Sequence, residues 1–160
     1  MTNIKQAVFI DLDHTLITTR SGRIFPIHSE DWKFIPDTLK ALDYFYKLGY
    51  KIIIVTNQGG IEEGYITEKV FLTKIETICK VLEKTLKFKA NSISYFYCNS
   101  MVSYHRKPCP GMAYEAALEY DLNLKDSIMI GNMDSDVQFA ENSGISGYYH
   151  VDELAGLNWK

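Results

Sequence analysis

Short apolar segments that alternate with longer amphipathic segments are the feature that most constrains the fold of this 160-residue chain. Short runs rich in β-forming residues predict buried strands at residues 7–12, 51–55, 93–97 and 127–130, with a short final strand at 148–149. Apolar residues recur at helical spacing at residues 36–48, 67–87, 111–120 and 135–142. This alternation predicts an α/β fold, with a parallel sheet and helices on both faces, in one Rossmann-like domain that covers residues 1–160.

Single residues mark where several of these elements begin and end. Pro36 is favoured in the first turn of a helix, and Gly49 is suited to the end of that helix. Thr67 is a suitable N-cap for the longest helix, whose apolar repeat includes Val70 and Val81.

Composition and charge exclude several classes of protein. Hydrophobic residues make up 46% of the chain and charged residues 23%, which is typical of soluble globular proteins and not of disordered chains or coiled coils. No apolar run approaches the ~18 residues of a membrane span, and residues 1–6 lead into the first strand without a secretory signal. A net charge of −3 disfavours a polyanionic partner, and the odd count of three cysteines indicates a reduced, cytoplasmic protein.

Polar side chains of complementary chemistry follow the four main predicted strands. They are Asp11 and Asp13 after the first strand, Thr56 and Asn57 after the second, Lys107 in the loop after the third, and Asn132, Asp134 and Asp136 after the fourth. Ligands of parallel α/β sheets bind outside the carboxyl ends of the strands. We therefore expect these groups to converge at one edge of the sheet and to carry the chemistry of the protein.

The pair Asp11 and Asp13 favours a bound cation, because two carboxylates placed together repel each other. Mg²⁺ prefers oxygen ligands, a few carboxylates and a substrate phosphate. One carboxylate can then act as the nucleophile of aspartyl-phosphate chemistry, and its neighbour can act as general acid and then as general base. A hydroxyl and a lysine opposite, such as Thr56 and Lys107, are suited to holding phosphoryl oxygens and to stabilising charge in the transition state.

These motifs resemble those of the haloacid dehalogenase superfamily of phosphotransferases. Four segments carry the resemblance: Asp11-Leu12-Asp13-His14-Thr15-Leu16, Val55-Thr56-Asn57-Gln58, Arg106-Lys107-Pro108, and Gly131-Asn132 through Asp136. The resemblance implies a phosphatase that depends on Mg²⁺, hydrolyses a phosphomonoester and forms an aspartyl-phosphate intermediate.

The resemblance also assigns roles to individual residues. Asp11 would be the nucleophile, and Asp13 would protonate the leaving oxygen and later activate water. Lys107 would neutralise the charges of the phosphoryl group and of Asp11. Phosphate or substrate would be held by Thr56, Asn57 and Arg106.

The implied metal site and one neighbouring position depart from the pattern of the superfamily. The resemblance places Mg²⁺ on four residues, directly or through water: Asp11, Asp13, Asn132 and Asp136. The superfamily usually has Asp where Asn132 stands, so one negative charge is lost and we expect weaker binding of Mg²⁺. It also commonly has Gly at position 14, where His14 either is tolerated or points at the substrate.

Two gaps between the motifs are too short for the cap domain that many members of the superfamily carry. Residues 15–36 include a segment, 21–32, that is predicted as a loop or irregular hairpin because it contains glycine and proline. Residues 58–106 are occupied by one helix and one strand. We therefore predict a capless site, which is open to large substrates or is closed by loops or a partner.

Two groups of phosphatases resemble different parts of the chain and imply different substrates. Residues 15–26 with Asp31-Trp32 resemble the phosphatase domain of polynucleotide kinase/3′-phosphatases. Residues 106–112 with Asp136-Val137-Gln138 resemble heptose-bisphosphate and histidinol-phosphate phosphatases. Many of the latter carry a zinc loop, but this chain offers only Cys98, His105 and Cys109 in that region, so we expect no structural zinc.

The first prediction from these resemblances is a polynucleotide 3′-phosphatase that heals nucleic-acid ends. Arg20 and Arg23 could then line the site, and Tyr95 and Tyr97 could either stack on bases or pack half-buried on a strand. The alternative is a phosphatase of D-glycero-D-manno-heptose 1,7-bisphosphate, or a related small sugar or histidinol phosphatase. An alternative of another class, motivated by Asn132, is a weak or inactive remnant that only binds phosphate.

Overall fold

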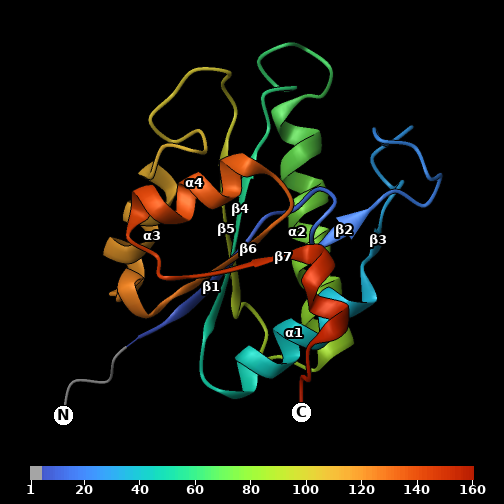
Figure 1. Ribbon diagram of the computed structural model, residues 1–160. Helices are drawn as coiled ribbons and strands as arrows, with labels where there is room; N and C mark the ends of the chain where they lie inside the picture. Colours follow the sequence, from blue (N-terminus) through green and yellow to red (C-terminus); the bar gives the residue numbers. More distant parts are fainter. Residues whose placement is uncertain (1–4) are drawn as a thin grey trace.

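Five parallel strands form the central sheet of the computed structural model, which describes residues 5–160 (Figure 1). The strands are β1 (Ala7–Ile10), β4 (Lys51–Asn57), β5 (Ile93–Cys98), β6 (Ile128–Gly131) and β7 (Gly147–His150). Their order across the sheet is β5-β4-β1-β6-β7, and each neighbouring pair is parallel. From β1 the chain adds β4 and β5 on one side, and it then crosses over to add β6 and β7 on the other side. Ligands of open α/β sheets bind at such a switch in strand order, which here lies between β1 and β6.

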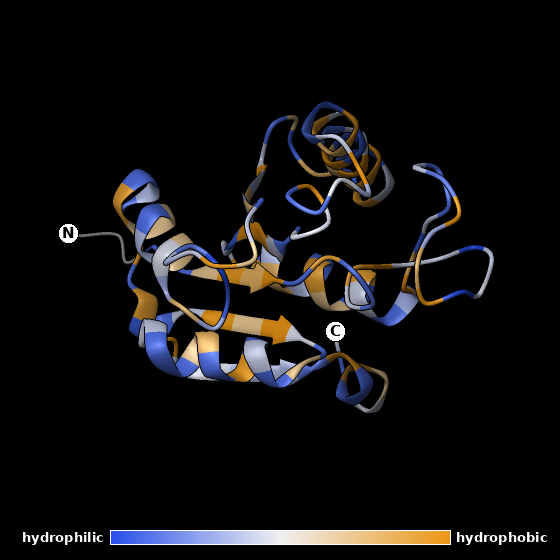
Figure 2. Cartoon of the chain, turned by 90° about the horizontal axis from the view of Figure 1, so that it is seen from above, coloured by the Kyte–Doolittle hydropathy of each residue, from blue (hydrophilic) through white to orange (hydrophobic). Residues whose placement is uncertain are grey.

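Helices cover both faces of the sheet, which confirms the predicted α/β architecture. On one face lie α1 (Pro36–Lys47) and α2 (Glu68–Leu86), where Ile52 and Phe71 belong to the same buried cluster. On the other face lie α3 (Gly111–Tyr120) and α4 (Asp134–Ser143), where the rings of Phe9 and Phe139 meet edge to face. Figure 2 shows the apolar strands lying between helices whose outer faces are hydrophilic.

Several smaller elements lie outside the central sheet. The two-residue strands β2 (Ile17–Thr18) and β3 (Lys33–Phe34) pair in antiparallel fashion, which confirms an irregular hairpin around residues 21–32. The 3₁₀ turns η1 (Leu124–Asp126) and η2 (Val151–Gly156) are not predicted, because such short turns leave no periodic pattern in the sequence. After η2, the ring of Trp159 packs against Tyr44 and Phe45 of α1.

A helix cap, a glycine and the pairing of strands explain where the long elements begin and end. Thr67 is the N-cap of α2, because its side chain accepts a hydrogen bond from Val70 N at 3.1 Å. Gly49 follows α1 with a φ of 93°, a conformation that glycine adopts without strain. Strand β4 runs two residues further than predicted, because Thr56 and Asn57 still pair with β5.

Neither long connection between the motifs holds an inserted domain within residues 5–160. The β2–β3 hairpin and its loop connect β1 to α1, and α2 with a preceding loop connects β4 to β5. The carboxyl edge of the sheet therefore lacks a cap domain, as predicted. Over the same residues, no helix combines the length and the apolar character that crossing a membrane requires.

The loop between β2 and β3 is exposed along its whole length from residue 20 to residue 30, and Figure 1 shows it projecting beside the sheet. Its base is held by the buried carboxylate of Asp31. This carboxylate accepts hydrogen bonds from the Ser21 hydroxyl at 2.6 Å, the Ser21 N–H at 2.9 Å and the Ile27 N–H at 3.0 Å. These hydrogen bonds, the Ser21 hydroxyl first, lower the pKa of Asp31 to about 2.

We expect the substitution Asp31→Asn to destabilise the protein at neutral pH but not at strongly acidic pH. Because the pKa of Asp31 is lower in the folded protein than its unfolded value of about 3.9, its stabilising effect is complete above pH 4 and is lost as the pH falls towards 2. Urea unfolding of both proteins between pH 2 and 7 measures this, with Asp37→Asn on the surface of α1 as the matched control. A difference in stability that does not change with pH would contradict this role of Asp31.

Candidate active site

The carboxylate of Asp11 lies at the end of the central strand β1. The Asp11 N–H donates to Ile130 O of β6 at 3.0 Å, which fixes the backbone where β1 leaves the sheet. Its side chain is buried, with 8% of the residue's surface exposed. One oxygen, Oδ1, accepts a hydrogen bond from Lys107 Nζ at 2.8 Å, and the other, Oδ2, accepts one from Thr15 Oγ1 at 3.2 Å.

The ammonium group of Lys107 is buried between two carboxylates. Lys107 Nζ donates to Asp11 Oδ1 at 2.8 Å, to Asp136 Oδ1 at 2.7 Å and to Val55 O at 2.9 Å. All three protons of the ammonium are therefore used, and the group is fixed in direction as well as in place. The structure thus brings Asp11, Lys107 and Asp136 together from three separate segments, at the edge where the sequence predicts them.

The charges of this cluster shift the acidity of its members. Burial raises the pKa of Asp11 to about 6, although Lys107 acts in the opposite direction. Burial alone would lower the pKa of Lys107, but the two carboxylates outweigh it, so the pKa lies above its usual value. The lysine therefore stays charged at neutral pH, and it favours the ionised form of Asp11.

Asn57 positions Lys107 through its main chain. Asn57 Nδ2 donates to Lys107 O at 3.0 Å, and Asn57 Oδ1 accepts from Lys107 N at 2.9 Å. Both ends of the amide are occupied by this pair of bonds. The side chain that the resemblance assigns to phosphate therefore also holds the main chain of Lys107 in place.

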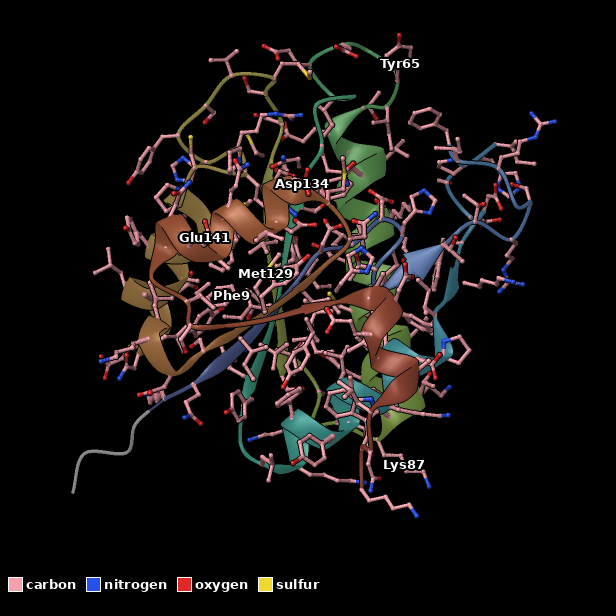
Figure 3. The ribbon with its side chains drawn as sticks, in the orientation of Figure 1. Phe9, Tyr65, Lys87, Met129, Asp134 and Glu141 are labelled. Atoms are coloured by element: carbon pink, nitrogen blue, oxygen red, sulfur yellow. The ribbon has the colours of Figure 1, made fainter. Side chains whose placement is uncertain are left out.

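Asp136 joins the lysine to the start of α4. Its Oδ2 accepts hydrogen bonds from the N–H groups of Asn132 and Met133, both at 3.1 Å. A Cβ atom at position 131 would lie 2.4–2.6 Å from the Cβ, Oδ2 and Cγ atoms of Asp136, so this close approach requires glycine. Figure 3 shows the neighbouring Asp134 at the start of α4, at the same end of the molecule as the loop of Tyr65 and opposite Lys87.

Asp11, Thr15 and Asn132 form a place that suits a hard cation. Thr15 Oγ1 lies 3.2 Å from Asp11 Oδ2 and 3.3 Å from Asn132 Oδ1. A hydroxyl carries one proton and can satisfy only one of these two acceptor oxygens at a time. Carboxylate and amide oxygens in excess of donors are the ligands that Mg²⁺ prefers.

The number of carboxylates at this place is small. Among residues 5–160, no three His, Cys, Asp or Glu side chains gather into a metal site by themselves. A Mg²⁺ ion here would therefore depend on the amide oxygen of Asn132, on water and on a substrate phosphate in addition to Asp11. Because Asp136 already accepts three hydrogen bonds, a water bridge is the simpler way for it to take part.

The side chain of Asp13 is half-buried and faces β4. Gln58 Nε2 donates to Asp13 Oδ2 at 3.1 Å and to Thr56 Oγ1 at 2.9 Å, so this amide links Asp13 to the strand that carries Thr56. Gln58 and Thr15 are the two residues of the site to which sequence reasoning assigns no role. Both lie inside the motifs that carry the resemblance, and that position is the signal that points to them.

The side chains of Arg106, Cys98 and His105 contact groups outside the carboxylate–lysine cluster. Arg106 Nη1 donates to Ser100 O at 3.3 Å and lies close to Gly59, so its role in substrate binding stays a prediction. Cys98 Sγ donates to Ser100 O at 3.5 Å, and His105 Nε2 lies 3.2 Å from Glu115 Oε2. Those two side chains therefore have partners other than a metal.

Comparison with known proteins gives consistent results. The family model described as Polynucleotide kinase 3 phosphatase matches residues 6–153. A D-glycero-beta-D-manno-heptose-1,7-bisphosphate 7-phosphatase of Helicobacter pylori is 32% identical over 99% of this chain and 81% of its own length. A D-glycero-alpha-D-manno-heptose-1,7-bisphosphate 7-phosphatase of Photorhabdus laumondii is 34% identical over 72% of this chain and 67% of its own length.

A solved structure extends the likeness to the fold. The crystal structure of D,D-heptose 1,7-bisphosphate phosphatase from B. bronchiseptica, complexed with magnesium and phosphate, has a TM-score of 0.74 and 21% sequence identity. The match covers 89% of this chain and 78% of that one. Together with the buried Asp11–Lys107–Asp136 cluster, these matches show that the chain belongs to the polynucleotide kinase 3 phosphatase family and is a capless phosphatase of the haloacid dehalogenase superfamily.

Proposed function

We propose that this phosphatase acts through an aspartyl-phosphate at Asp11. The observation that carries the proposal is the 2.8 Å contact between Asp11 Oδ1 and the buried ammonium of Lys107, which Asp136 fixes from the other side. Lys107 favours the ionised form of this carboxylate against the effect of burial, and a phosphoryl group that approaches it meets a fixed positive charge. This arrangement supports catalysis and argues against a remnant that only binds phosphate.

The reaction has two displacements at phosphorus. In the first, a carboxylate oxygen of Asp11 forms a bond to phosphorus while the bond to the leaving oxygen breaks, and Asp13 gives that oxygen a proton. In the second, water forms a bond to phosphorus, Asp13 takes its proton, and the bond to Asp11 breaks to release phosphate. In this proposal Lys107 stabilises the charge on the phosphoryl oxygens in both steps, and the Thr56 hydroxyl, which accepts a hydrogen bond from Gln58, donates its own proton to one of them.

Mg²⁺ is the metal that we propose for this site, held by Asp11, Asn132 and the backbone carbonyl of Asp13, with Asp136 through water. When bound, it would supply positive charge that reduces the repulsion between the Asp11 carboxylate and the phosphate. The acceptor oxygens that share the Thr15 hydroxyl support this proposal. The B. bronchiseptica structure, complexed with magnesium and phosphate, supports it as well.

We expect Asn132→Asp to bind Mg²⁺ about tenfold more tightly than the wild type, because an additional carboxylate charge raises the affinity of an oxygen site. Isothermal titration with MgCl₂ measures this directly and does not depend on turnover. Asn158→Asp, at an exposed position of the C-terminal tail, is the matched control and should leave the affinity unchanged. Equal affinities for Asn132→Asp and the wild type would remove Asn132 from the metal site.

For the substrate, we propose a small sugar bisphosphate of the heptose 1,7-bisphosphate type. The names of the relatives from H. pylori and P. laumondii support this class, and the former aligns with nearly the whole chain. The structure also removes part of the case for nucleic acid. Tyr95 and Tyr97 are half-buried and donate their hydroxyl protons to Glu76 and Glu68 of α2, so they do not form a free stacking surface.

A 3′-phosphate at a nucleic-acid end is the second candidate. The matching family model supports it, and so does the loop that follows β2, where Asp31 organises a segment that resembles polynucleotide 3′-phosphatases. Arg20 Nε donates to Trp32 O at 2.7 Å and thus helps to hold the two ends of this loop together. Arg23 is exposed.

A side-by-side assay separates these candidates. Phosphate release is measured with Mg²⁺ from both anomers of heptose 1,7-bisphosphate and from a 3′-phosphorylated oligonucleotide, with Asp11→Asn as the inactive control. We expect turnover of the sugar, and ³¹P NMR then shows which of its two phosphates is lost. Turnover of the oligonucleotide alone would overturn the proposed substrate class and leave the proposed mechanism in place.

A further inference from the structure

His14 has a backbone conformation that residues with side chains rarely adopt. Its φ is 59°, in the left-handed region. It stands between Asp13 and Thr15, so it is the immediate neighbour of two residues of the active site. A glycine would adopt this backbone with less strain, which indicates that the imidazole has a use that offsets the cost.

The imidazole of His14 connects the active-site motif to the exposed loop 20–30. His14 Nε2 lies 2.8 Å from Ile24 O, and His14 Nδ1 lies 3.3 Å from Thr18 Oγ1. Because a carbonyl can only accept, Nε2 is the donor to Ile24 O. One ring therefore joins the nucleophile motif, strand β2 and the middle of the loop.

Besides His14, the Thr19 hydroxyl holds the middle of this loop, because it donates a hydrogen bond to Arg23 O at 2.5 Å. The contacts that Asp31 makes with Ser21 and Ile27 lie near its two ends. The side chains at the middle do not pack on the core, because Ile24 is 75% exposed and Phe25 is 79% exposed. The His14 hydrogen bond is thus a second contact at the middle of the loop, and it ties this apolar part to the nucleophile motif.

We propose that His14 is a positioning residue, which holds the middle of loop 20–30 beside Asp11 so that the loop forms a wall for the leaving group of the substrate. The proposal rests on the proposed function, because the wall has a use only when a phosphate ester is bound at Asp11. The carboxyl edge of the sheet has no cap domain within residues 5–160, so a fixed loop supplies contacts that an open site would lack. Ile24 and Phe25 are the apolar surface that the loop offers.

Limited proteolysis tests the hydrogen bond without any assay of activity. Trypsin cleaves after Arg23, next to the carbonyl that His14 holds. We expect cleavage there to be about three- to tenfold faster in His14→Asn and His14→Gly, which both accept a left-handed backbone but cannot reach Ile24, as expected for the loss of one hydrogen bond. His28→Asn is the matched control, because His28 lies in the same loop and its ring accepts a local hydrogen bond from Glu30 N. Unchanged cleavage in both His14 variants would overturn the positioning role.

Steady-state kinetics test the wall. We expect the KM for heptose 1,7-bisphosphate to rise by about three- to tenfold in both His14 variants, while kcat/KM for methyl phosphate, whose leaving group is too small to reach the loop, changes less than twofold. An equal loss of kcat/KM for the two substrates would overturn the role of the loop as a wall, because a general disturbance of Asp11 affects every ester. If the wild type does not turn over the sugar, the proposed substrate fails, and the cleavage assay still decides the role of His14.

Discussion

Asp11→Asn should reduce kcat by at least about 10⁴-fold while the protein stays folded. The amide cannot form the phosphorylated intermediate, and removal of a covalent nucleophile costs several orders of magnitude in rate even when binding is intact. The amide oxygen can still accept the hydrogen bond from Lys107, so the buried cluster keeps its shape. Release of phosphate from the substrate, measured beside the control Asp43→Asn on α1, checks this expectation. Residual activity above about 1% of wild type would contradict the role of Asp11 as nucleophile.

The same variant should be at least as stable as the wild type above pH 6 when Mg²⁺ is absent. Burial raises the pKa of Asp11 to about 6 in the folded protein, whereas the unfolded value is about 3.9. The folded state therefore binds this proton more tightly, and ionisation of Asp11 lowers the stability of the wild type as the pH rises from 4 through 6. Asn does not ionise, so thermal unfolding in EDTA should show the Tm of the variant rising relative to that of the wild type as the pH increases from 4 to 6. A difference in Tm that stays constant from pH 4 to 8 would contradict the raised pKa.

The edge of the sheet where the active site lies is predictable from sequence, because a single physical rule places it. Asp11, Lys107 and Asp136 are far apart in the chain, but each follows a strand of a parallel sheet, and the carboxyl ends of such strands share one edge. The helices are predictable for a similar reason, since their apolar residues must face the sheet. Val70 and Val81 are exceptions, because they fit the helical repeat of α2 yet are 42% and 38% exposed. A repeat in sequence marks the centre of a buried face better than its margins.

The direction of individual side chains is not predictable in this way. The resemblance assigns Asn57 to phosphate, which stays a prediction, but the residue type does not predict that its amide also holds the main chain of Lys107, 50 residues away in the sequence. From the sequence, His14 either is tolerated or points at the substrate, whereas in the structure its backbone is left-handed and its ring bonds to Ile24 O. Such contacts depend on distances between loops, and the residue type alone contains no information about those distances.

Lys107→Met should cause the largest loss of stability among these substitutions, together with loss of activity. The variant leaves the carboxylates of Asp11 and Asp136 buried without their cation, and removal of one partner from a buried ion pair costs about 3–5 kcal/mol. For a protein of this size we expect the Tm to fall by about 6–20 °C. Differential scanning calorimetry at pH 8 in EDTA measures the effect, and Lys47→Met, which removes an exposed ion pair with Asp43 on α1, is the matched control.

A second substitution distinguishes loss of the ammonium charge from loss of packing. If the uncompensated carboxylates cause the loss of stability, then the double variant Lys107→Met, Asp136→Asn should be more stable than Lys107→Met alone. One of the two buried negative charges is absent from the double variant. Lowering the pH to 5 should also narrow the difference between Lys107→Met and wild type, because protonation of the carboxylates removes the same charge. If neither change restores stability, the cost arises from the shape of the side chain. The buried ammonium would then be needed for the phosphoryl group rather than for the fold, and the loss of activity would stand apart from the loss of stability.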